Sequence, residues 1–418
     1  MRKSLWRLPA AAAAVLVLGL TACSSSSSSS GSSPQASGGS TAAAGGNGKT
    51  LTVFVTGTFQ AAGIDYQDAS AAITAKADEV NAAGGINGEQ IKVIVCDDQH
   101  NPNQATACAR QAVSDQALAV LAPSSAAGFG PQVLPVLAAA KIPVIDMPAT
   151  DSTVWTSTNS YPFDTGAPAQ YAGVALALKQ AGCTDVGSIQ LPVPAGATSA
   201  KYLADGVTQL GGHLVKNIQV GMTESSYSSE VAQLVVAGAK CVVPIILPTE
   251  QVKLISAVKQ SGQQLLIGGV TAAFNQQLLT SLGSAANGIL LAGPNYLPTD
   301  TSVPAIQDML AAMKKYTPGT SASDTYGTSA WGAATLLFSS VLPSIKGPIT
   351  SAAISDALNH ARNLTVGTYA PYTFSSPPPN PQLPRLMNTG LLLWKVENTI
   401  PTLATKDFID ISKALGTS

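Results

Sequence analysis

The chain has 418 residues, of which 11% are charged, and its formal net charge at pH 7 is −1. Without the basic residues that open the chain (Arg2, Lys3 and Arg7), 19 basic residues face 23 acidic ones, so the remainder carries about −4. This mild acidity argues against the basic patch with which proteins bind nucleic acid. No later stretch approaches the roughly 18 apolar residues of a membrane-spanning helix. The 370 residues that follow Gly48 are enough for two domains.

The first 23 residues have the layout of a secretory signal peptide. A basic start precedes the apolar run Ala10–Leu20, which is shorter than the roughly 20 residues that cross a bilayer. The run ends in Leu20-Thr21-Ala22-Cys23, which resembles the bacterial lipobox. This resemblance implies cleavage before Cys23 and attachment of lipid to its thiol and its new amino group. Ordinary cleavage that leaves a free cysteine is the alternative.

Residues 24–48 are rich in Ser, Gly and Ala and contain no aromatic residue. Such a chain cannot bury apolar surface, so we predict a disordered linker between the anchored end and a folded body. More than one acyl chain on Cys23 gives stable anchoring, which fits a tethered protein at the outer face of the cell membrane.

Strands and helices alternate through the body of the chain. The predicted strands are Leu51–Thr56, Ile91–Val95, Leu118–Ala122, Pro143–Asp146, Val186–Leu191, Leu214–Val220, Cys241–Leu247, Leu265–Gly268, Gly288–Leu291 and Gly390–Val396. Helical patterns occupy Asp68–Ala83, Ala169–Ala181, Ser199–Leu210, Ser226–Ala237, Glu250–Ser261, Phe274–Ser281, Val303–Tyr316 and Asp324–Leu342, and further helices open at Pro102 and Pro131.

The strands are near-continuous apolar runs, which is typical of parallel sheets covered on both faces. Because a second series of alternating helices and strands begins near residue 169, we predict an α/β fold of two doubly wound parallel-sheet lobes joined by a multi-strand hinge. Lobe 1 comprises residues 49–165 plus 297–370, and lobe 2 comprises residues 166–296 plus 371–418. The late helices are expected to return to lobe 1.

Four cysteines remain after Cys23, and an even number in an exported chain indicates disulfides. Cys96 ends a predicted strand and Cys108 lies in the stretch that follows. Cys183 and Cys241 each begin a strand of lobe 2, in which the first and third strands are neighbours about 4.8 Å apart. Of the three possible pairings, we predict Cys96–Cys108 and Cys183–Cys241.

Two short motifs carry a resemblance to a known family. The first is Asn81-Ala82-Ala83-Gly84-Gly85-Ile86-Asn87-Gly88, and the second is Lys141–Ile145 followed by Pro148-Ala149-Thr150. With them, residues 49–295 resemble a type I periplasmic binding protein of the branched-chain amino-acid class. The resemblance implies a monomer without cofactor that captures a small molecule between two lobes and delivers it to the permease subunits of an ABC importer. A receptor that passes the signal to a membrane partner would use the same features and stays an alternative.

Three loops of lobe 1 follow strand ends, where ligands bind in open α/β sheets. In the family, a Ser after the third strand and a Thr after the fourth hold the ligand's carboxylate. We therefore predict Ser124 or Ser125 and Thr150 as ligand-binding residues, with the backbone of Ala149 beside them. The alternative is that these residues cap helices and form turns.

Lobe 2 departs from the family's amino-acid pattern. Loop 192–197 has no aromatic residue where the amino-acid binders place a Tyr, and loop 268–273, with Thr271, has no acid for the ligand's amino group. Glu250 is expected in a first helical turn. A buried, unpaired ammonium is costly, so the sequence favours a carboxylate, amide, polyol or aromatic acid without one. The aromatic candidates for stacking on it, each with core packing as the alternative, are Tyr66, Trp155, Phe274 and Tyr296.

An enzyme is the rival class, and none of its usual motifs is present. The chain lacks a phosphate-binding G-x-x-x-x-G-K, a G-x-G-x-x-G after a strand and a G-x-S-x-G elbow. With three histidines and no C-x-x-C, a metal site is not expected. We interpret the acidic pair Asp97-Asp98 near His100 as a solvated capping loop rather than an acid/base site, and we predict no catalytic residue.

Overall fold

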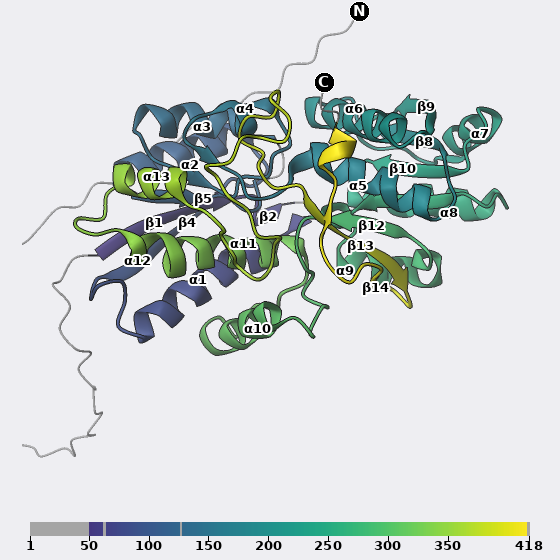
Figure 1. The fold of residues 1–418 in the computed structure, drawn as a ribbon. Helices are drawn as coiled ribbons and strands as arrows, with labels where there is room; N and C mark the ends of the chain where they lie inside the picture. Colours follow the sequence, from purple (N-terminus) through teal and green to yellow (C-terminus); the bar gives the residue numbers. More distant parts are fainter. Residues whose placement is uncertain (1–49, 62–63, 126–127, 416–418) are drawn as a thin grey trace, which may run out of the picture. The chain divides into compact units, whose positions relative to one another are not determined.

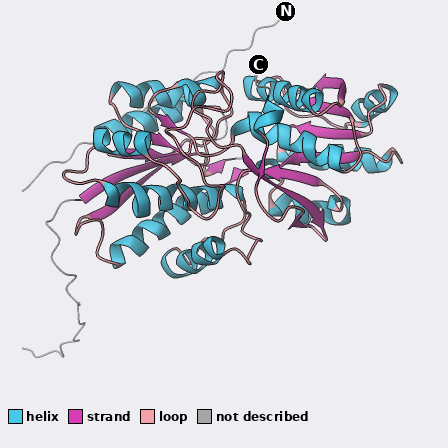
Figure 2. Ribbon diagram, viewed as in Figure 1, coloured by secondary structure: helices cyan, strands magenta, loops and turns pink. Residues whose placement is uncertain are grey.

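The computed structural model describes residues 50–61, 64–125 and 128–415. The predicted signal peptide, its Cys23 and the predicted linker 24–48 lie outside these described residues. Figure 1 shows the elements in chain order, and Figure 2 shows helices packed around two groups of strands. Two separate, helix-covered sheets of mainly parallel strands confirm the predicted fold class.

In the described part of the chain, the first sheet has five parallel strands in the order β4-β1-β5-β6-β7. Their bounds are Gln90–Asp97 for β4, Thr50–Gly57 for β1, Ala119–Leu121 for β5, Val144–Ile145 for β6 and Ser160–Tyr161 for β7. The helices between them are α1 (Gln67–Ala82), α2 (Pro102–Ser114), α3 (Gly130–Ala139) and α4 (Ser152–Thr156), and a small hairpin joins β2 (Gln60–Ala61) to β3 (Ile64–Asp65). Because β4 and β5 flank β1 on opposite sides, the winding reverses at β1, which is where open α/β sheets bind ligands.

The second sheet repeats this plan and adds antiparallel strands. Among residues 128–415 its order is β14-β13-β12-β11-β10-β8-β9, with β15 also paired to β13. The parallel strands are β8 (Asp185–Gln190), β9 (His213–Gln219), β10 (Cys241–Ile245), β11 (Leu266–Val270) and β12 (Leu290–Gly293). The antiparallel strands are β13 (Gly390–Glu397), β14 (Ile400–Leu403) and β15 (Ile409–Asp410).

The helices that accompany the second sheet match the predicted pattern closely. They are α5 (Gly166–Gln180), α6 (Pro194–Gln209), α7 (Ser228–Val236), α8 (Pro248–Gln260) and α9 (Gln276–Leu282), with short 3-10 turns at Thr271–Ala273, Gly283–Ala286 and Ser412–Leu415. The predicted helix Phe274–Ser281 instead begins at Gln276, because the Asn275 side chain accepts a hydrogen bond from the N–H of Leu278 and caps the helix there.

The first sheet packs against a separate hydrophobic cluster on each of its two faces. Val53 and Val55 of β1 face the cluster that contains α1, whereas Phe54 between them faces the cluster that contains Leu134 of α3. Successive side chains of a strand point to opposite faces, so a strand covered on both faces needs an uninterrupted apolar run. The same alternation recurs in β10, where Val242 and Val243 enter different clusters.

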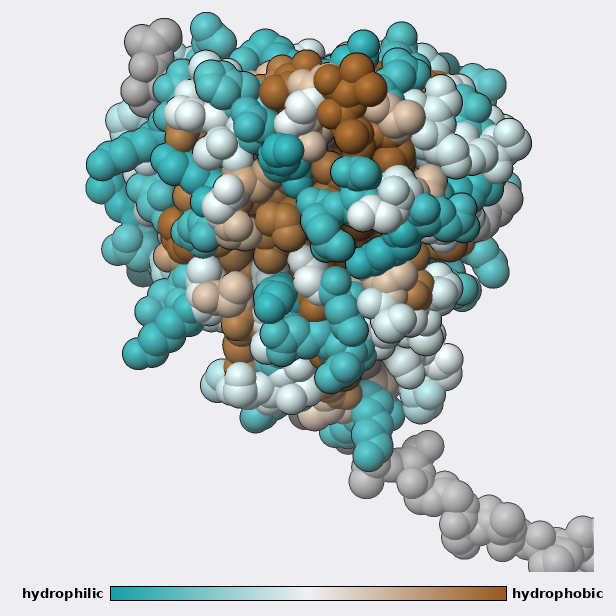
Figure 3. All heavy atoms as spheres, turned by 90° about the vertical axis from the view of Figure 1, so that its right-hand side faces the viewer, coloured by the Kyte–Doolittle hydropathy of each residue, from teal (hydrophilic) through white to brown (hydrophobic). Residues whose placement is uncertain are grey.

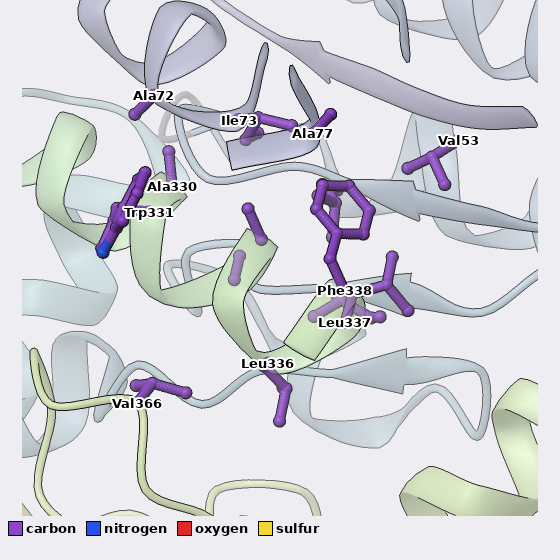
Figure 4. Packing of buried hydrophobic residues seen from close by; sticks show 14 of the residues in the cluster. Val53, Ala72, Ile73, Ala77, Ala330, Trp331, Leu336, Leu337, Phe338 and Val366 are labelled. Atoms are coloured by element: carbon purple, nitrogen blue, oxygen red, sulfur yellow. The ribbon is translucent and has the colours of Figure 1, made fainter. Parts of the chain in front are cut away.

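Late helices complete the core of the first sheet. α10 (Pro304–Tyr316) and α11 (Thr325–Thr335) pack against α1. A π-helical turn (Leu336–Val341) and α12 (Leu342–Ser344) continue α11, so the predicted helix Asp324–Leu342 is one segment with a widened turn. Figure 4 shows Ile73 and Ala77 of α1 together with Phe338 and Val53 in this core. The short helix α13 (Ser351–His360), which the sequence did not indicate, contributes buried Ile354 and Leu358.

The proline-rich segment before β13 has contacts that the sequence did not indicate. Tyr372 and Phe374 lie in the cluster with α1, and Leu383 and Leu386 lie in the cluster with α3. Residues 371–418, which were expected in lobe 2, therefore belong to both units. The part before β13 packs against the first sheet, and the strands β13, β14 and β15 join the second sheet. Burial of these four apolar side chains explains the division.

A buried indole fixes β13, the strand that follows the third passage of the chain between the sheets. Trp394 of β13 is fully buried, and its Nε1–H donates to the carboxylate of Asp300, 3.3 Å from Oδ2. The same oxygen accepts from the N–H of Leu297 over 2.7 Å. Asp300 precedes α10, so this contact joins the second passage to the third.

Both predicted disulfides are confirmed. Cys96, at the end of β4, is bonded to Cys108 of α2, with a Cα–Cα distance of 5.7 Å. Cys183 is bonded to Cys241 with a Cα–Cα distance of 6.3 Å, and β8 and β10 are neighbours in the sheet. The second pair closes because the first and third parallel strands of this unit lie side by side.

Hydrophobic residues on the surface are scattered. Figure 3 shows one face, on which hydrophilic residues surround smaller hydrophobic groups. The exposed large apolar residues include Val236 at the end of α7, which is 89% exposed, and Met222, which is 48% exposed. None of the helices in the described residues is long and apolar enough to cross a bilayer.

Candidate functional site

A cavity of about 430 Å³ lies where the carboxyl ends of strands from both sheets meet. Residues that follow β1, β4, β5 and β6 form one wall, and residues that follow β8, β9, β10 and β11 form the other. The first two segments in which the chain passes between the sheets supply the floor, together with the start of α11 and Tyr369. This size falls in the range of about 300–1,000 Å³ that is typical of small-molecule sites.

Two hydroxyls on the first wall have no partner within the described residues. Ser124 Oγ and Thr150 Oγ1 are both buried from solvent and make no hydrogen bond. Gly57 makes room for Ser124, since a Cβ at position 57 would collide with its Oγ. Buried polar groups are nearly always hydrogen-bonded, so two free hydroxyls on a cavity wall are what a site for a polar ligand group would offer.

The acidic pair Asp97-Asp98 holds two lining residues in place. Thr58 Oγ1 donates to Asp98 Oδ1 over 2.6 Å, and the backbone N–H of His100 donates to the same oxygen over 2.9 Å. Asp97 accepts from two backbone N–H groups of the loop after β1. The pair therefore organises a loop, but the prediction of a solvated capping loop is wrong in two respects: Asn101 caps α2 instead, and Asp98 is buried. Burial raises the pKa of Asp98, and the bond from Thr58 opposes that rise.

The second wall is mainly apolar, with hydroxyls from Ser199 of α6 and Thr249 of α8. Its apolar side chains after β8, β9, β10 and β11 include Leu191, Val193, Ala195, Met222, Ile246, Leu247, Val270, Ala272 and Ala273. Helix α6 begins at this wall with Pro194, and its N-cap residue Val193 provides no side-chain acceptor. The positive end of the α6 dipole thus faces the cavity.

Glu250 does not contribute to that wall. It lies in the first turn of α8, as predicted, and is almost fully buried. Its carboxylate accepts from the N–H of Glu224 and from Tyr227 Oη, and it pairs with Lys253 Nζ at 2.8 Å. Glu250 therefore holds the loop before α7 rather than a ligand.

The floor is polar and aromatic. Asp164 lies in the first passage between the sheets, and its Oδ1 accepts from the N–H of Gly166 over 2.6 Å and from Gln170 Nε2 over 3.0 Å. Burial raises the pKa of Asp164, and these two bonds oppose the rise. Tyr171 of α5 lines the cavity beside them, and burial raises the pKa of its phenol to about 12.

A second carboxylate lies behind this floor. Tyr369 Oη donates to Ser329 Oγ over 2.6 Å, and Ser329 Oγ donates to Asp146 Oδ2. Tyr369 and Ser329 line the cavity, whereas Asp146 does not. Complete burial raises the pKa of Asp146 well above its usual range. The chain of hydroxyls therefore ends on a carboxyl group that is protonated more readily than an exposed one.

Another buried acid pair supports the aromatic side of the cavity. Asp68 Oδ2 accepts from the N–H groups of Ser323 and Asp324 over 2.8 and 3.3 Å. Asp324 Oδ1 in turn caps α11 by accepting from the N–H of Tyr326. The rings of Tyr326 and Tyr66 lie 4.5 Å apart, and both line the cavity.

The structure brings together some of the predicted site residues and not others. Ser124, Thr150 and Tyr66 line the cavity. Ser125, Ala149 and Thr271 do not, although each is next to a residue that does. Ala149 is fully buried and its carbonyl accepts from the N–H of Ala167, and Thr271 packs against Gly293.

Of the aromatic candidates, those other than Tyr66 pack elsewhere. Trp155 lies in the core with Leu383, Phe274 is buried in the core of the second sheet, and Tyr296 packs against Phe408. Core packing was the alternative that the sequence left open for each. No cluster of three His, Cys, Asp or Glu residues that could hold a metal ion occurs in the described residues.

Comparison with known proteins decides the family. The family model described as periplasmic binding protein matches residues 51–386, which include both sheets' parallel strands. The chain belongs to the periplasmic binding protein family. A relative described as an amino acid binding protein of Pseudomonas aeruginosa is 52% identical over 46 residues, a match that spans 11% of this chain and 12% of that relative's length.

Solved structures share the fold of this periplasmic binding protein. A branched-chain amino acid ABC transporter protein from Thermus thermophilus with bound valine has a TM-score of 0.75 at 17% identity, covering 87% of this chain and 98% of that one. A fatty acid ABC transporter substrate-binding protein from Thermomonospora curvata has a TM-score of 0.74 at 18% identity, covering 88% and 94%. A solute-binding protein from R. palustris in complex with benzoate has a TM-score of 0.68 at 16% identity, covering 86% and 96%.

Proposed function

We propose that this protein captures a small organic molecule in the cavity between two lobes and delivers it to an ABC importer. The observation that carries the proposal is the cavity, where two buried hydroxyls without partners among the described residues, Ser124 Oγ and Thr150 Oγ1, face a mainly apolar wall. A site of this composition orients a ligand by its polar end and encloses the rest. The valine, fatty-acid and benzoate proteins named above share the fold, and the three ligands share a carboxylate.

The lobes of this proposal are the two sheets with their helices. They comprise approximately residues 49–165 with 297–370 and residues 166–296 with 371–418, except that the part of 371–418 before β13 packs against the first sheet. The chain passes between them in three places within the described residues, after β7, after β12 and before β13. Several short connections of this kind permit hinge closure around a ligand. In this proposal Ser124, Thr150 and Tyr66 bind the ligand from the first lobe, and no residue is catalytic.

We further propose that the protein is exported and anchored by lipid on Cys23 at the outer face of the cell membrane. The support is the lipobox-like sequence and the Ser-rich stretch after it. Fractionation of cells that express the wild type and Cys23→Ala tests this. The wild type should remain with the membrane and the variant should be released; equal release of both would contradict anchoring.

Mass spectrometry of molecules released on denaturing the purified protein tests ligand capture directly. A released organic molecule that binds again to the stripped protein, and that reduces the radius of gyration in small-angle scattering, is the expected result. Turnover of that molecule would instead indicate an enzyme. Co-purification with permease subunits, and loss of uptake on deletion of the gene, test delivery to the importer.

A further inference from the structure

We infer that the floor of the cavity binds a hydrogen-bond-donating group of the ligand, and that Asp146, which lies behind the floor, sets this preference. This inference rests on the proposed function and concerns the same cavity. Three side chains of the floor have oxygens whose hydrogens are already given to inner partners, or which carry no hydrogen. Such oxygens accept from a ligand and do not donate to it.

The first of these oxygens is Oη of Tyr369. It donates to Ser329 Oγ over 2.6 Å, and Ser329 Oγ donates in turn to Asp146 Oδ2. Tyr369 and Ser329 line the cavity, whereas Asp146 does not. A hydroxyl has one hydrogen and two lone pairs, so Tyr369 Oη, whose hydrogen points toward Ser329, offers only lone pairs to a ligand.

The second oxygen is Oγ1 of Thr325, at the start of α11. It donates to Asn295 Oδ1 over 2.7 Å. The orientation of the Asn295 amide is fixed, because its Nδ2 donates to the carbonyl oxygens of Thr325 and Tyr296 over 3.0 and 3.3 Å. Thr325 and Asn295 both line the cavity and are buried. The Thr325 hydroxyl is therefore also left with lone pairs alone.

The third oxygen belongs to Asp164, in the first passage between the sheets. Its Oδ1 accepts from the N–H of Gly166 and from Gln170 Nε2. Its Oδ2 makes no hydrogen bond within the described residues, and Asp164 lines the cavity. An ionised carboxylate accepts and never donates, so Oδ2 gives the floor another acceptor.

The ring of Tyr369 is held in place, which keeps its Oη against Ser329. Its centroid lies 4.6 Å from that of Phe163. On the side of α11, a Cβ at Gly332 would come within 3.3 Å of two carbons of the ring. The direction of the hydroxyl hydrogens, rather than movement of the ring, therefore decides what Tyr369 offers to the cavity.

Asp146 controls that direction. When it is ionised it can only accept, so it draws the hydrogens of Ser329 and Tyr369 away from the cavity. When it is protonated it can donate to Ser329 Oγ, which frees the Ser329 hydrogen for Tyr369 Oη and turns the phenol hydrogen toward the cavity. Asp146 is thus a positioning residue, since it acts on the ligand through two hydroxyls.

The ionisable groups that act on Asp146 come from two neighbouring segments. Burial raises the pKa of Asp146 well above its usual range, the bond from Ser329 opposes that rise, and the charge of Asp164 adds to it. The phenols of Tyr369 and Tyr372 lie in the segment after α13, and burial and then the charge of Asp146 raise the pKa of each. The pKa of Asp164 is itself raised by burial, so a test must separate the two acids.

Calorimetric titration with three compounds of one skeleton tests the inference: cyclohexanol, cyclohexylammonium and cyclohexanone. The cavity of about 430 Å³ has room for a six-carbon ring. The alcohol and the ammonium can donate to the floor, whereas the ketone can only accept. We expect the alcohol to bind at least about tenfold more tightly than the ketone at pH 9, because the ketone oxygen would face acceptors without a partner.

Variants on α11 and beyond it isolate the hydroxyls. Tyr369→Phe removes the acceptor, and Ser329→Ala frees the phenol hydrogen for the ketone, so each should reduce the ratio of alcohol to ketone affinity to below about threefold. Thr328→Val is the matched control. Thr328 is fully buried, its Oγ1 has no partner within the described residues and it does not line the cavity, so this variant should keep the ratio of the wild type.

The pH dependence of the ratio distinguishes positioning by Asp146 from simple packing. In the wild type the ratio should fall at least about threefold as the pH is lowered from 9 to 4, because protonated Asp146 lets Tyr369 donate to the ketone. In Ser329→Ala this dependence should disappear. If it persists there, it comes from Asp164, and the role given to Asp146 is wrong.

The three compounds also separate this inference from the proposed function. The stronger binder of the ammonium and the alcohol shows whether the donor is charged or neutral, and either order supports a donor-binding floor when the ketone is weakest. Equal affinity for the alcohol and the ketone at pH 9 would overturn the inference and leave solute capture intact. So would failure of all three to bind to a protein that releases another molecule on denaturation. If none binds and the denatured protein releases no molecule, the proposed function is wrong as well.

Discussion

Asp68 gives the sharpest prediction about stability. It lies at the start of α1, is 2% exposed, and its pKa is raised from 3.8 to about 6, chiefly by burial and against the hydrogen bonds from Ser323 and Asp324. Its Oδ1 has no partner in the described residues, and the nearby Asp324 has its own pKa raised by burial and by the charge of Asp68. Asp68→Asn keeps an oxygen for the backbone N–H groups and removes the charge.

The magnitude follows from the pKa values. Because the folded-state pKa is above the unfolded one, the folded protein binds more protons between pH 4 and pH 6, and the free energy of unfolding falls as the pH rises through that window. The gap between 3.8 and about 6 corresponds to about 3 kcal/mol. The variant cannot ionise at this position, so its unfolding free energy relative to the wild type should rise by about 2–3 kcal/mol between pH 4 and pH 8.

Urea denaturation of both proteins, followed by circular dichroism at several pH values, measures this difference. Asp308→Asn on the exposed face of α10 is the control, and it should change the unfolding free energy by less than about 0.5 kcal/mol at either pH. A difference between wild type and Asp68→Asn that stays constant from pH 4 to pH 8 would refute the reasoning, because it would mean that ionisation of Asp68 costs the folded protein nothing.

Other predictions concern the site, a disulfide and the hinge. Thr150→Ala should lower ligand affinity roughly ten- to a hundredfold by calorimetry while the melting temperature stays within a few degrees; the reverse pattern would make Thr150 a turn former only. Replacing Cys183 and Cys241 together by serine should lower the unfolding free energy by about 4 kcal/mol in non-reducing urea denaturation, since the bond closes a loop with a separation of 58 residues, and a loss below 1 kcal/mol would contradict the chain-entropy account. Trp394→Phe should cost about 1–3 kcal/mol, because it leaves the buried Asp300 carboxylate without its indole donor, and unchanged stability would show that the bond contributes little.

The fold was predictable from local signals because they agree with one another. Apolar runs marked the strands, and prolines at the first helical turn marked several helix starts, such as Pro102 in α2. The Cys183–Cys241 bond followed from strand order alone, since the first and third strands of such a sheet are neighbours. By contrast, the short α13 has only two fully buried residues, Ile354 and Leu358, and gave too weak a pattern to find.

The site was predictable only where its residues follow strands of the first sheet. Ser124 and Thr150 could be found because each stands in a loop beyond a strand end. Tyr171 could not, because twelve of the fifteen residues of α5 are buried and nothing in that pattern marks which of them face a cavity. Asp164 could not, because it follows β7, a strand of two residues that leaves no apolar run in the sequence. Tyr369 was missed because it lies in the irregular segment between α13 and β13, whose path depends on long-range packing.

The late return of α11 to the first sheet has a consequence for biogenesis. Trp331 and Phe338 complete a core that begins with Val53, and β13 completes the other sheet later still. When a ribosome or a secretion channel releases the chain from its N-terminus, neither sheet can complete its core until almost the last residue has emerged. The polypeptide therefore stays unfolded enough to pass through a narrow channel during most of its synthesis. Truncation anywhere before β13 should yield a protease-sensitive product rather than one stably folded lobe.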